Sequence, residues 1–128
     1  MKKNLNLILS GIIVIVAGCV YGGHPSYLMP LLLDYQVEAL ELKNMLRALM
    51  GIYLGIGVFW LFGAYRSTFW YAATLSNVLF MGGISFGRIV STFFDGVSIP
   101  FTPALVLELL FFAWGWYNLK KYPEYLSD

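Results

Sequence analysis

The sequence is poor in charge and in the side chains that bind metals or carry out redox chemistry. Only 12% of its 128 residues are charged, and it has one histidine and one cysteine, His24 and Cys19. A single cysteine excludes an internal disulfide and any Cys-x-x-Cys motif, and a metal site would have to be built from carboxylates. The net charge of +1 gives no basis for binding nucleic acid. We therefore expect no metal, no cofactor and no nucleic acid partner.

Apolar residues are what the sequence has in excess. They make up 59% of the chain, aromatic residues alone make up 18%, and the mean hydropathy is +0.73. A typical soluble domain is only about 45–50% apolar and about 25% charged. Because a soluble fold of this size could not bury so much apolar surface, the composition predicts an integral membrane protein.

Four apolar stretches are each long enough to cross a bilayer, since about 20 residues of helix span a hydrocarbon core of about 30 Å. Lipid cannot satisfy exposed backbone polar groups, so all four are expected to be helices. The predicted fold is all-α: a polytopic four-transmembrane-helix bundle, forming a single domain over residues 1–128. The predicted spans are 5–22, 44–64, 69–94 and 101–119.

Basic residues gather on one side of this four-span arrangement. They are Lys2, Lys3, Arg66, Lys120 and Lys121. The other side carries one lysine, Lys43, and four acidic residues: Asp34, Glu38, Glu41 and Asp95. The positive-inside rule therefore predicts a multi-pass protein of a bacterial cytoplasmic membrane with both termini inside. Aromatic residues beside the predicted inner turn are typical of an interfacial belt: Trp60, Tyr65, Trp70 and Tyr71.

Two segments near the outer side need separate interpretation. In the longest connection, 23–43, the i, i+4, i+7 spacing of Leu33, Val37 and Leu40 predicts an amphipathic extension of the second spanning helix. The end of the first span, Val16–Cys19, resembles a lipoprotein processing box. Its apolar run of about 17 residues exceeds the usual 7–15 of a signal core. We expect a retained helix, with lipidation of Cys19 as the alternative.

Glycines recur at a spacing that permits close helix packing. Three G-x-x-x-G pairs occur: Gly18 with Gly22, Gly51 with Gly55, and Gly83 with Gly87. Gly11 and Gly18 also suit close packing of the first span. Small residues four apart let helix backbones approach one another in a membrane. The pattern is common by chance, so it predicts a compact bundle without specifying which helices meet.

The third span carries a polar stripe. At 100° per residue, five residues fall close to one line along the helix, with Ser85 and Ser91 beside them. The five are Asn77, Met81, Arg88, Thr92 and Asp95. A polar stripe in lipid must face protein or trapped water.

The fourth span supplies a partner for Arg88. Arg88 and Glu108 lie six and seven residues in from the outer ends at Phe94 and Phe101, so both are about 10 Å deep at about 1.5 Å per residue. Counting from the inner ends gives unequal depths, which tilt of the longer third span would reduce. An unpaired charge at mid-helix is unfavourable by about 2.5–3.5 kcal/mol. We therefore predict an Arg88–Glu108 pair, either as structural glue or as part of a ligand or proton site.

The candidate binding site is an intramembrane polar cluster. Its residues are Arg47, Arg88, Glu108, Asn44, Asp95 and Ser91. Arg47 has the alternative of reaching the membrane interface. Arg47, Arg88 and Glu108 sum to one positive charge, which suits an anionic head group or a polarised carbonyl unless Asp95 neutralises it.

Three functions fit this cluster. The first is a non-enzymatic protein that binds a membrane lipid or other amphiphile in a polar pocket of the outer leaflet. The second is an accessory subunit that packs against other membrane-protein subunits. The third is an enzyme acting on a membrane-dissolved substrate with Glu108 as acid or base, although no nucleophile, metal or phosphate-loop constellation supports it. No catalytic residue is therefore assigned.

Three stretches together resemble a known family. They are "LKNMLRALMGIYLGIGVFW", "GGISFGRIVSTFFDG" and "LVLELLFFAWG". They resemble a bacterial domain-of-unknown-function family of small four-helix membrane proteins, broadly similar in architecture to the DoxX-like group. The resemblance implies the same fold and singles out the same polar residues, but it supplies no reaction. DoxX-like proteins have been linked to quinone-associated redox systems, whereas this chain lacks a redox cysteine pair.

Overall fold

The computed structural model describes residues 2–123, and all of its regular elements are helices. The elements in order are α1 (Lys2–Gly22), α2 (Pro25–Leu33), α3 (Leu40–Tyr65), α4 (Ser67–Asp95), the 3-10 turn η1 (Ile99–Phe101) and α5 (Thr102–Lys121). No strand occurs between residues 2 and 123. Prolines lie in the first turns of α2, η1 and α5, where a missing N–H removes no helical hydrogen bond.

Four helices are long and apolar enough to cross a membrane: α1, α3, α4, and α5 together with η1. They confirm the predicted all-α, four-span fold. The boundaries differ by a few residues, the largest change being that α3 begins at Leu40 rather than Asn44. The connection between α3 and α4 is a single residue, Arg66, whose N–H donates to the carbonyl of Phe62 at 2.8 Å.

The connection between α1 and α3 is not the helical extension that the sequence predicted. A separate helix, α2, ends where Asp34 takes a left-handed conformation with φ of 57°. Residues 35–39 are not helical, and α3 starts only at Leu40. The apolar spacing was misleading because Val37 is buried against the core from a non-helical segment. Leu40, by contrast, is exposed.

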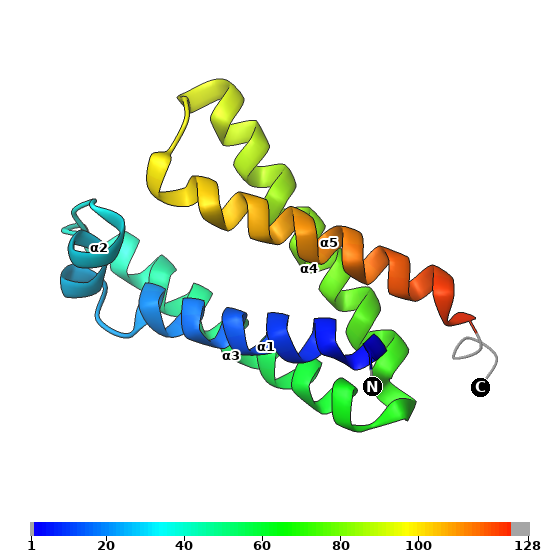
Figure 1. Ribbon diagram of the computed structural model, residues 1–128. Helices are drawn as coiled ribbons and strands as arrows, with labels where there is room; N and C mark the ends of the chain where they lie inside the picture. The colour runs from blue at the N-terminus through cyan, green and yellow to red at the C-terminus, as the bar shows by residue number, and fades with distance from the viewer. Residues whose placement is uncertain (1, 124–128) are drawn as a thin grey trace.

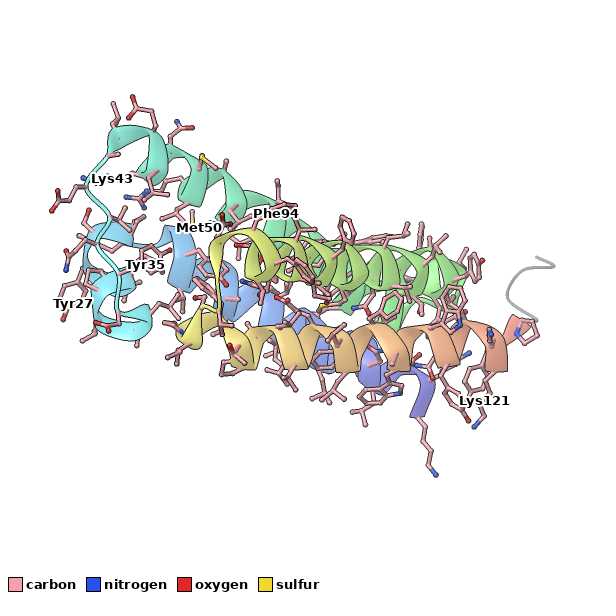
Figure 2. The ribbon with its side chains drawn as sticks, turned by 90° about the horizontal axis from the view of Figure 1, so that it is seen from above. Tyr27, Tyr35, Lys43, Met50, Phe94 and Lys121 are labelled. Atoms are coloured by element: carbon pink, nitrogen blue, oxygen red, sulfur yellow. The ribbon has the colours of Figure 1, made fainter. Side chains whose placement is uncertain are left out.

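The two ends of the molecule carry different segments. Figure 1 shows the start of α1, the end of α5 and the α3–α4 turn at one end, and α2 with the α4–α5 turn at the other. Figure 2, seen from above, places Lys121 at the opposite end from Tyr27 and Lys43. This is the arrangement that an even number of membrane crossings requires.

Helix α1 packs along α3 through glycines. A Cβ placed on Gly57 would lie 2.6 Å from Ile15 Cγ1 and 3.0 Å from the Gly11 carbonyl oxygen, and one placed on Gly18 would lie 2.8 Å from Tyr53 Cβ. The backbones of α1 and α3 can approach this closely only because these positions lack side chains. The predicted role of Gly11 and Gly18 in close packing is confirmed.

The other predicted glycine pairs do not meet a neighbouring helix. A Cβ on Gly51, Gly55, Gly83 or Gly87 would have no atom within 4 Å. The G-x-x-x-G spacing in α3 and α4 therefore marks surfaces that other parts of the described chain leave open.

The outward surface of the helices is apolar. Large aliphatic and aromatic side chains are exposed on all four long helices, among them Ile12, Val16, Ile52, Leu79, Phe86, Val106 and Leu110. Such a surface suits lipid and not water. Trp60 and Trp70 are an exception to the predicted aromatic belt, because both are fully buried in the core. Trp60 donates its indole N–H to the Ser76 hydroxyl at 3.0 Å.

Candidate functional site

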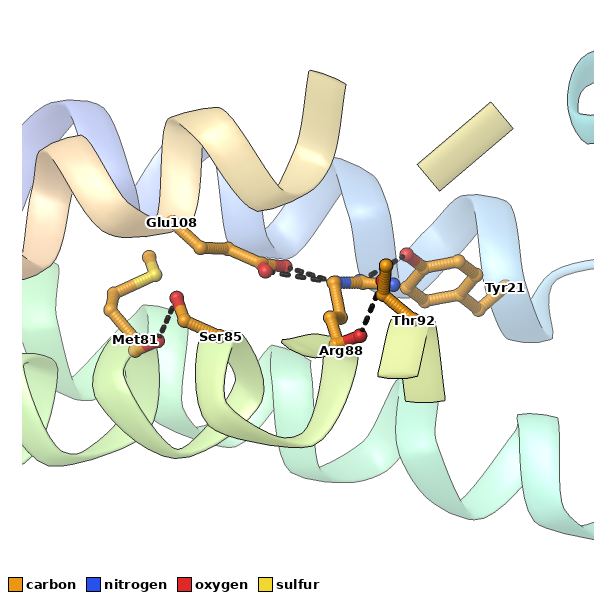
Figure 3. Close-up of polar contacts among 6 residues, drawn as sticks. All are labelled: Tyr21, Met81, Ser85, Arg88, Thr92 and Glu108. Carbon is orange, nitrogen blue, oxygen red and sulfur yellow. Dashed lines mark hydrogen bonds and ion pairs between the residues drawn. The ribbon is translucent and has the colours of Figure 1, made fainter. Parts of the chain in front are cut away.

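An ion pair between α4 and α5 is the centre of the site. The Nε atom of Arg88 donates to Oε1 and Oε2 of Glu108 at 3.0 and 2.8 Å, as Figure 3 shows. The side chains are 20% and 13% exposed, respectively. The pairing predicted from equal depth is confirmed. Each charge is compensated by the other in a partly buried position, which lowers the penalty of placing them in the apolar interior.

Helix α1 joins the pair through Tyr21. Nη2 of Arg88 donates to the Tyr21 hydroxyl at 3.4 Å (Figure 3). The Tyr21 ring meets Tyr53 of α3 edge-on, with centroids 5.5 Å apart. The guanidinium carbon also lies 4.8 Å from the ring centroid of Phe101, within range of a cation–π interaction. Arg88 thus connects all four spanning helices, directly or through Tyr21.

The segment between α2 and α3 closes over this point with aromatic contacts. Tyr35 lies 6.1 Å from Phe101 between ring centroids, and its hydroxyl donates to Met29 Sδ at 3.0 Å. Burial, and to a smaller extent the nearby Tyr21 phenol, raises the pKa of Tyr35 above its ordinary value. The phenol therefore keeps its proton and its hydrogen bond at neutral pH.

A cavity of about 420 Å³, which we call the outer cavity, lies beside Arg88 near the turn that joins α4 to α5. Small-molecule sites commonly fall between about 300 and 1,000 Å³. Its polar lining consists of Arg88, Ser91, Thr92, Ser98 and Thr102. Gly87 and Gly96 also line it, so two positions of the wall contribute no side chain.

A second, smaller cavity lies on the other side of the ion pair. It has a volume of about 80 Å³ and is walled by side chains of all four spanning helices, Tyr53, Phe80 and Glu108 among them. Arg88 lines only the outer cavity and Glu108 only the inner one, whereas Ile84 lines both. The ion pair therefore forms part of the wall between a polar and an apolar space.

Two more predicted site residues lie at the edge of the outer cavity. The Ser91 hydroxyl, which lines it, donates to Oδ2 of Asp95 at 2.9 Å. Both residues are exposed. The structure thus brings Arg88, Glu108, Ser91 and Asp95 together.

Arg47 and Asn44 do not join this group. Nη1 of Arg47 donates to the carbonyl oxygens of Gly22 and Gly23 at 2.6 and 2.8 Å. These carbonyls end α1, where the helix leaves them without intrahelical partners. Asn44 is exposed and makes no side-chain hydrogen bond within the described range. The guanidinium of Arg47 therefore binds the end of α1, and its positive charge does not contribute to the cavity.

A buried polar network joins three helices deeper in the bundle. Asn77 was predicted to lie on a stripe that faces protein, but its partners were not anticipated from the sequence. Asn77 Nδ2 donates to Ser10 Oγ at 2.7 Å, and Asn6 Nδ2 donates to the carbonyl of Phe111 at 3.3 Å. Ser10 Oγ donates in turn to the Asn6 carbonyl at 2.6 Å. The available signal was the i, i+4 spacing of Asn6 and Ser10 in an otherwise apolar span.

Four apolar spanning helices, a largely apolar outward surface and a partly buried ion pair define a multi-pass α-helical membrane protein. The chain belongs to the family described as a domain of unknown function, DUF4345, whose model matches residues 3–119. This confirms the predicted resemblance to a domain-of-unknown-function family. No curated protein and no solved structure gives a significant match.

Proposed function

We propose that the protein binds a membrane lipid or related amphiphile, without chemistry on it, with the ligand's head group in the α4–α5 cavity. The observation that carries the proposal is the cavity itself, which combines Arg88 with four hydroxyl side chains inside an apolar helical assembly. The exposed apolar side chains Phe86, Val90 and Val106 on the same two helices offer a surface for acyl chains outside it. A head group in the cavity and tails along α4 or α5 would satisfy both surfaces.

Filling the cavity tests this proposal. Gly87 lines it, and a Cβ there would meet no atom within 4 Å, so Gly87→Phe can start a side chain at this wall and place its ring in the space. We expect co-purified lipid, measured by native mass spectrometry, to fall by about tenfold, since losing a few polar contacts weakens binding by roughly 1.4 kcal/mol or more. Thermal stability should be unchanged.

Gly83→Phe is the matched control. Gly83 lies one turn earlier in α4, is equally open, and does not line the cavity. Its lipid content should stay at the wild-type level. Equal lipid content in both variants would refute binding in the cavity.

We also propose that the cavity end faces the outside of a bacterial cytoplasmic membrane, with both termini inside. The support is the distribution of basic residues: Lys2, Lys3 and Arg66 belong to the end opposite α2. Bacterial origin and a broad likeness to the DoxX-like group remain predictions from the sequence.

Cysteine labelling in intact cells tests the orientation. On a Cys19→Ser background, Val97→Cys in the α4–α5 turn should react with an impermeant maleimide, because Val97 is 72% exposed. Ser67→Cys, at the exposed start of α4, should react only after the membrane is opened. The reverse pattern would invert the orientation.

One separate observation supports the alternative role as an accessory subunit of a membrane complex. Gly51 and Gly55 on α3 leave open space that a neighbouring helix could enter. An enzymatic role for Glu108 has less support, because both carboxylate oxygens already accept from Arg88.

A further inference from the structure

The charge around the outer cavity is the first indication of what enters it. Glu108 neutralises Arg88 at 2.8 Å, and Arg47 is held at the end of α1. Asp95 adds a negative charge next to Ser91. The charged groups in contact with the lining therefore carry no excess of positive charge. An anionic head group would have to leave water for a site that does not compensate its charge.

The hydroxyl groups of the lining present mainly acceptors. The Ser91 hydroxyl donates its proton to Asp95, and the Thr92 hydroxyl donates to the Arg88 carbonyl (Figure 3). The Thr102 hydroxyl donates to the Ser98 carbonyl. Because a hydroxyl has one proton and two lone pairs, these three oxygens remain free to accept. A ligand that donates hydrogen bonds matches this wall.

The helix ends beside the cavity also lack free donors. At the start of α5 the N–H groups of Phe101 and Thr102 donate to the Ser98 and Ile99 carbonyls, and Pro103 has no N–H. No donor remains at these positions to bind an anion. The last turn of α4, on the other side of the cavity, carries the partial negative charge of a helix C-terminus.

Two groups of the lining residues keep donors without a partner among the described residues. Nη1 of Arg88 and the hydroxyl of Ser98 make no hydrogen bond to other described residues, and both residues line the space. The ligand must therefore accept some hydrogen bonds as well as donate several. A hydroxyl does both, whereas a phosphate monoester without its proton only accepts.

We infer that the cavity between α4 and α5 takes an uncharged head group bearing several hydroxyls, a glycerol or sugar carried on a lipid. The inference rests on the proposed function and names the class of ligand for the same site. Hydroxyl groups of the ligand donate to Asp95 and to the oxygens of Thr92 and Thr102. The Arg88 guanidinium donates to the ligand while it remains paired with Glu108.

Competition between lipids with identical acyl chains tests the inference. The full-length protein, in a polyoxyethylene detergent that has no sugar, is mixed with equal amounts of monoglucosyl diacylglycerol, phosphatidic acid and phosphatidylethanolamine. Native mass spectrometry should show the glucosyl lipid bound about fivefold more than either phospholipid, a preference of about 1 kcal/mol. Dodecyl maltoside, which has a sugar head group, should displace it.

Variants separate this inference from the proposed function. Asp95→Asn should reduce the preference for the glucosyl lipid over phosphatidic acid, because it removes the negative charge at the cavity edge. Thr102→Val, which keeps the side-chain shape, should weaken glucosyl lipid binding, whereas Thr68→Val at the other end of the molecule should not.

The outcomes are distinguishable. If Gly87→Phe loses all three lipids relative to Gly83→Phe but wild-type protein prefers phosphatidic acid or phosphatidylethanolamine, the proposed function stands and the uncharged head group is wrong. If Gly87→Phe loses none of them, the cavity does not bind lipid and both fail. A glucosyl preference that survives in Gly87→Phe places sugar binding elsewhere and also overturns the inference.

Discussion

Replacing Arg88 with methionine, or Glu108 with glutamine, should each lower the stability of the protein in detergent. Either change removes one member of a pair whose side chains are 20% and 13% exposed, and it leaves the other poorly compensated. Breaking a buried pair costs about 3–5 kcal/mol in soluble proteins, while polar contacts within membranes average only about 0.6 kcal/mol. For this partly exposed pair we expect about 2 kcal/mol, between these two limits.

The double variant, Arg88→Met with Glu108→Gln, should recover much of that loss because no charge is left uncompensated. Thermal unfolding of the four proteins gives the coupling energy by a double-mutant cycle. If the two single effects simply add, within about 0.5 kcal/mol, the residues do not interact. Arg88 would then be an interfacial arginine that reaches toward head groups.

The same variants also distinguish a purely structural role of the ion pair from a role in ligand binding. If the pair only holds α4 to α5, the double variant should regain stability and keep its bound lipid. If Arg88 also donates to a ligand in the outer cavity, the double variant should regain stability but bind less lipid. Tyr21→Phe provides a milder comparison, because it removes only the 3.4 Å hydrogen bond from Nη2.

The Arg88–Glu108 pair could be predicted from sequence because the turn that connects its helices is short. With only 96–98 and η1 between α4 and α5, counting back from the turn places both residues at one depth. Counting from the inner ends failed because α4 has 29 residues and α5 has 20, so those ends do not coincide.

Arg47 shows why the rest of the site could not be predicted. Its partners are the backbone carbonyls of Gly22 and Gly23, and every helix end offers such groups whatever its sequence. Only the packing of α1 against α3 brings this particular helix end to Arg47. The break at Asp34 likewise depends on Val37 being drawn into the core, which a periodicity of apolar residues cannot distinguish from a helix.

Replacing glycine by alanine in α3 should give the second large change in stability. The two positions to compare, Gly57 and Gly55, are only two residues apart. Gly57→Ala should destabilise the protein by about 1–3 kcal/mol, the usual cost of overpacking a filled interior. Its new Cβ would lie 2.6 Å from Ile15 Cγ1 and 3.0 Å from the Gly11 carbonyl oxygen. The isoleucine side chain can move, but the backbone oxygen can move only if α1 separates from α3.

Gly55→Ala is the matched control, because nothing lies within 4 Å of a Cβ at that position. It should be neutral or slightly stabilising, since alanine is favoured over glycine in a helix by up to about 1 kcal/mol. The sequence motif predicts the opposite order, because Gly55 belongs to G-x-x-x-G with Gly51 and Gly57 does not. Thermal unfolding of the two variants in detergent decides between them. A larger loss for Gly55→Ala would mean that α1 packs on the Gly51–Gly55 face of α3, contrary to the structure.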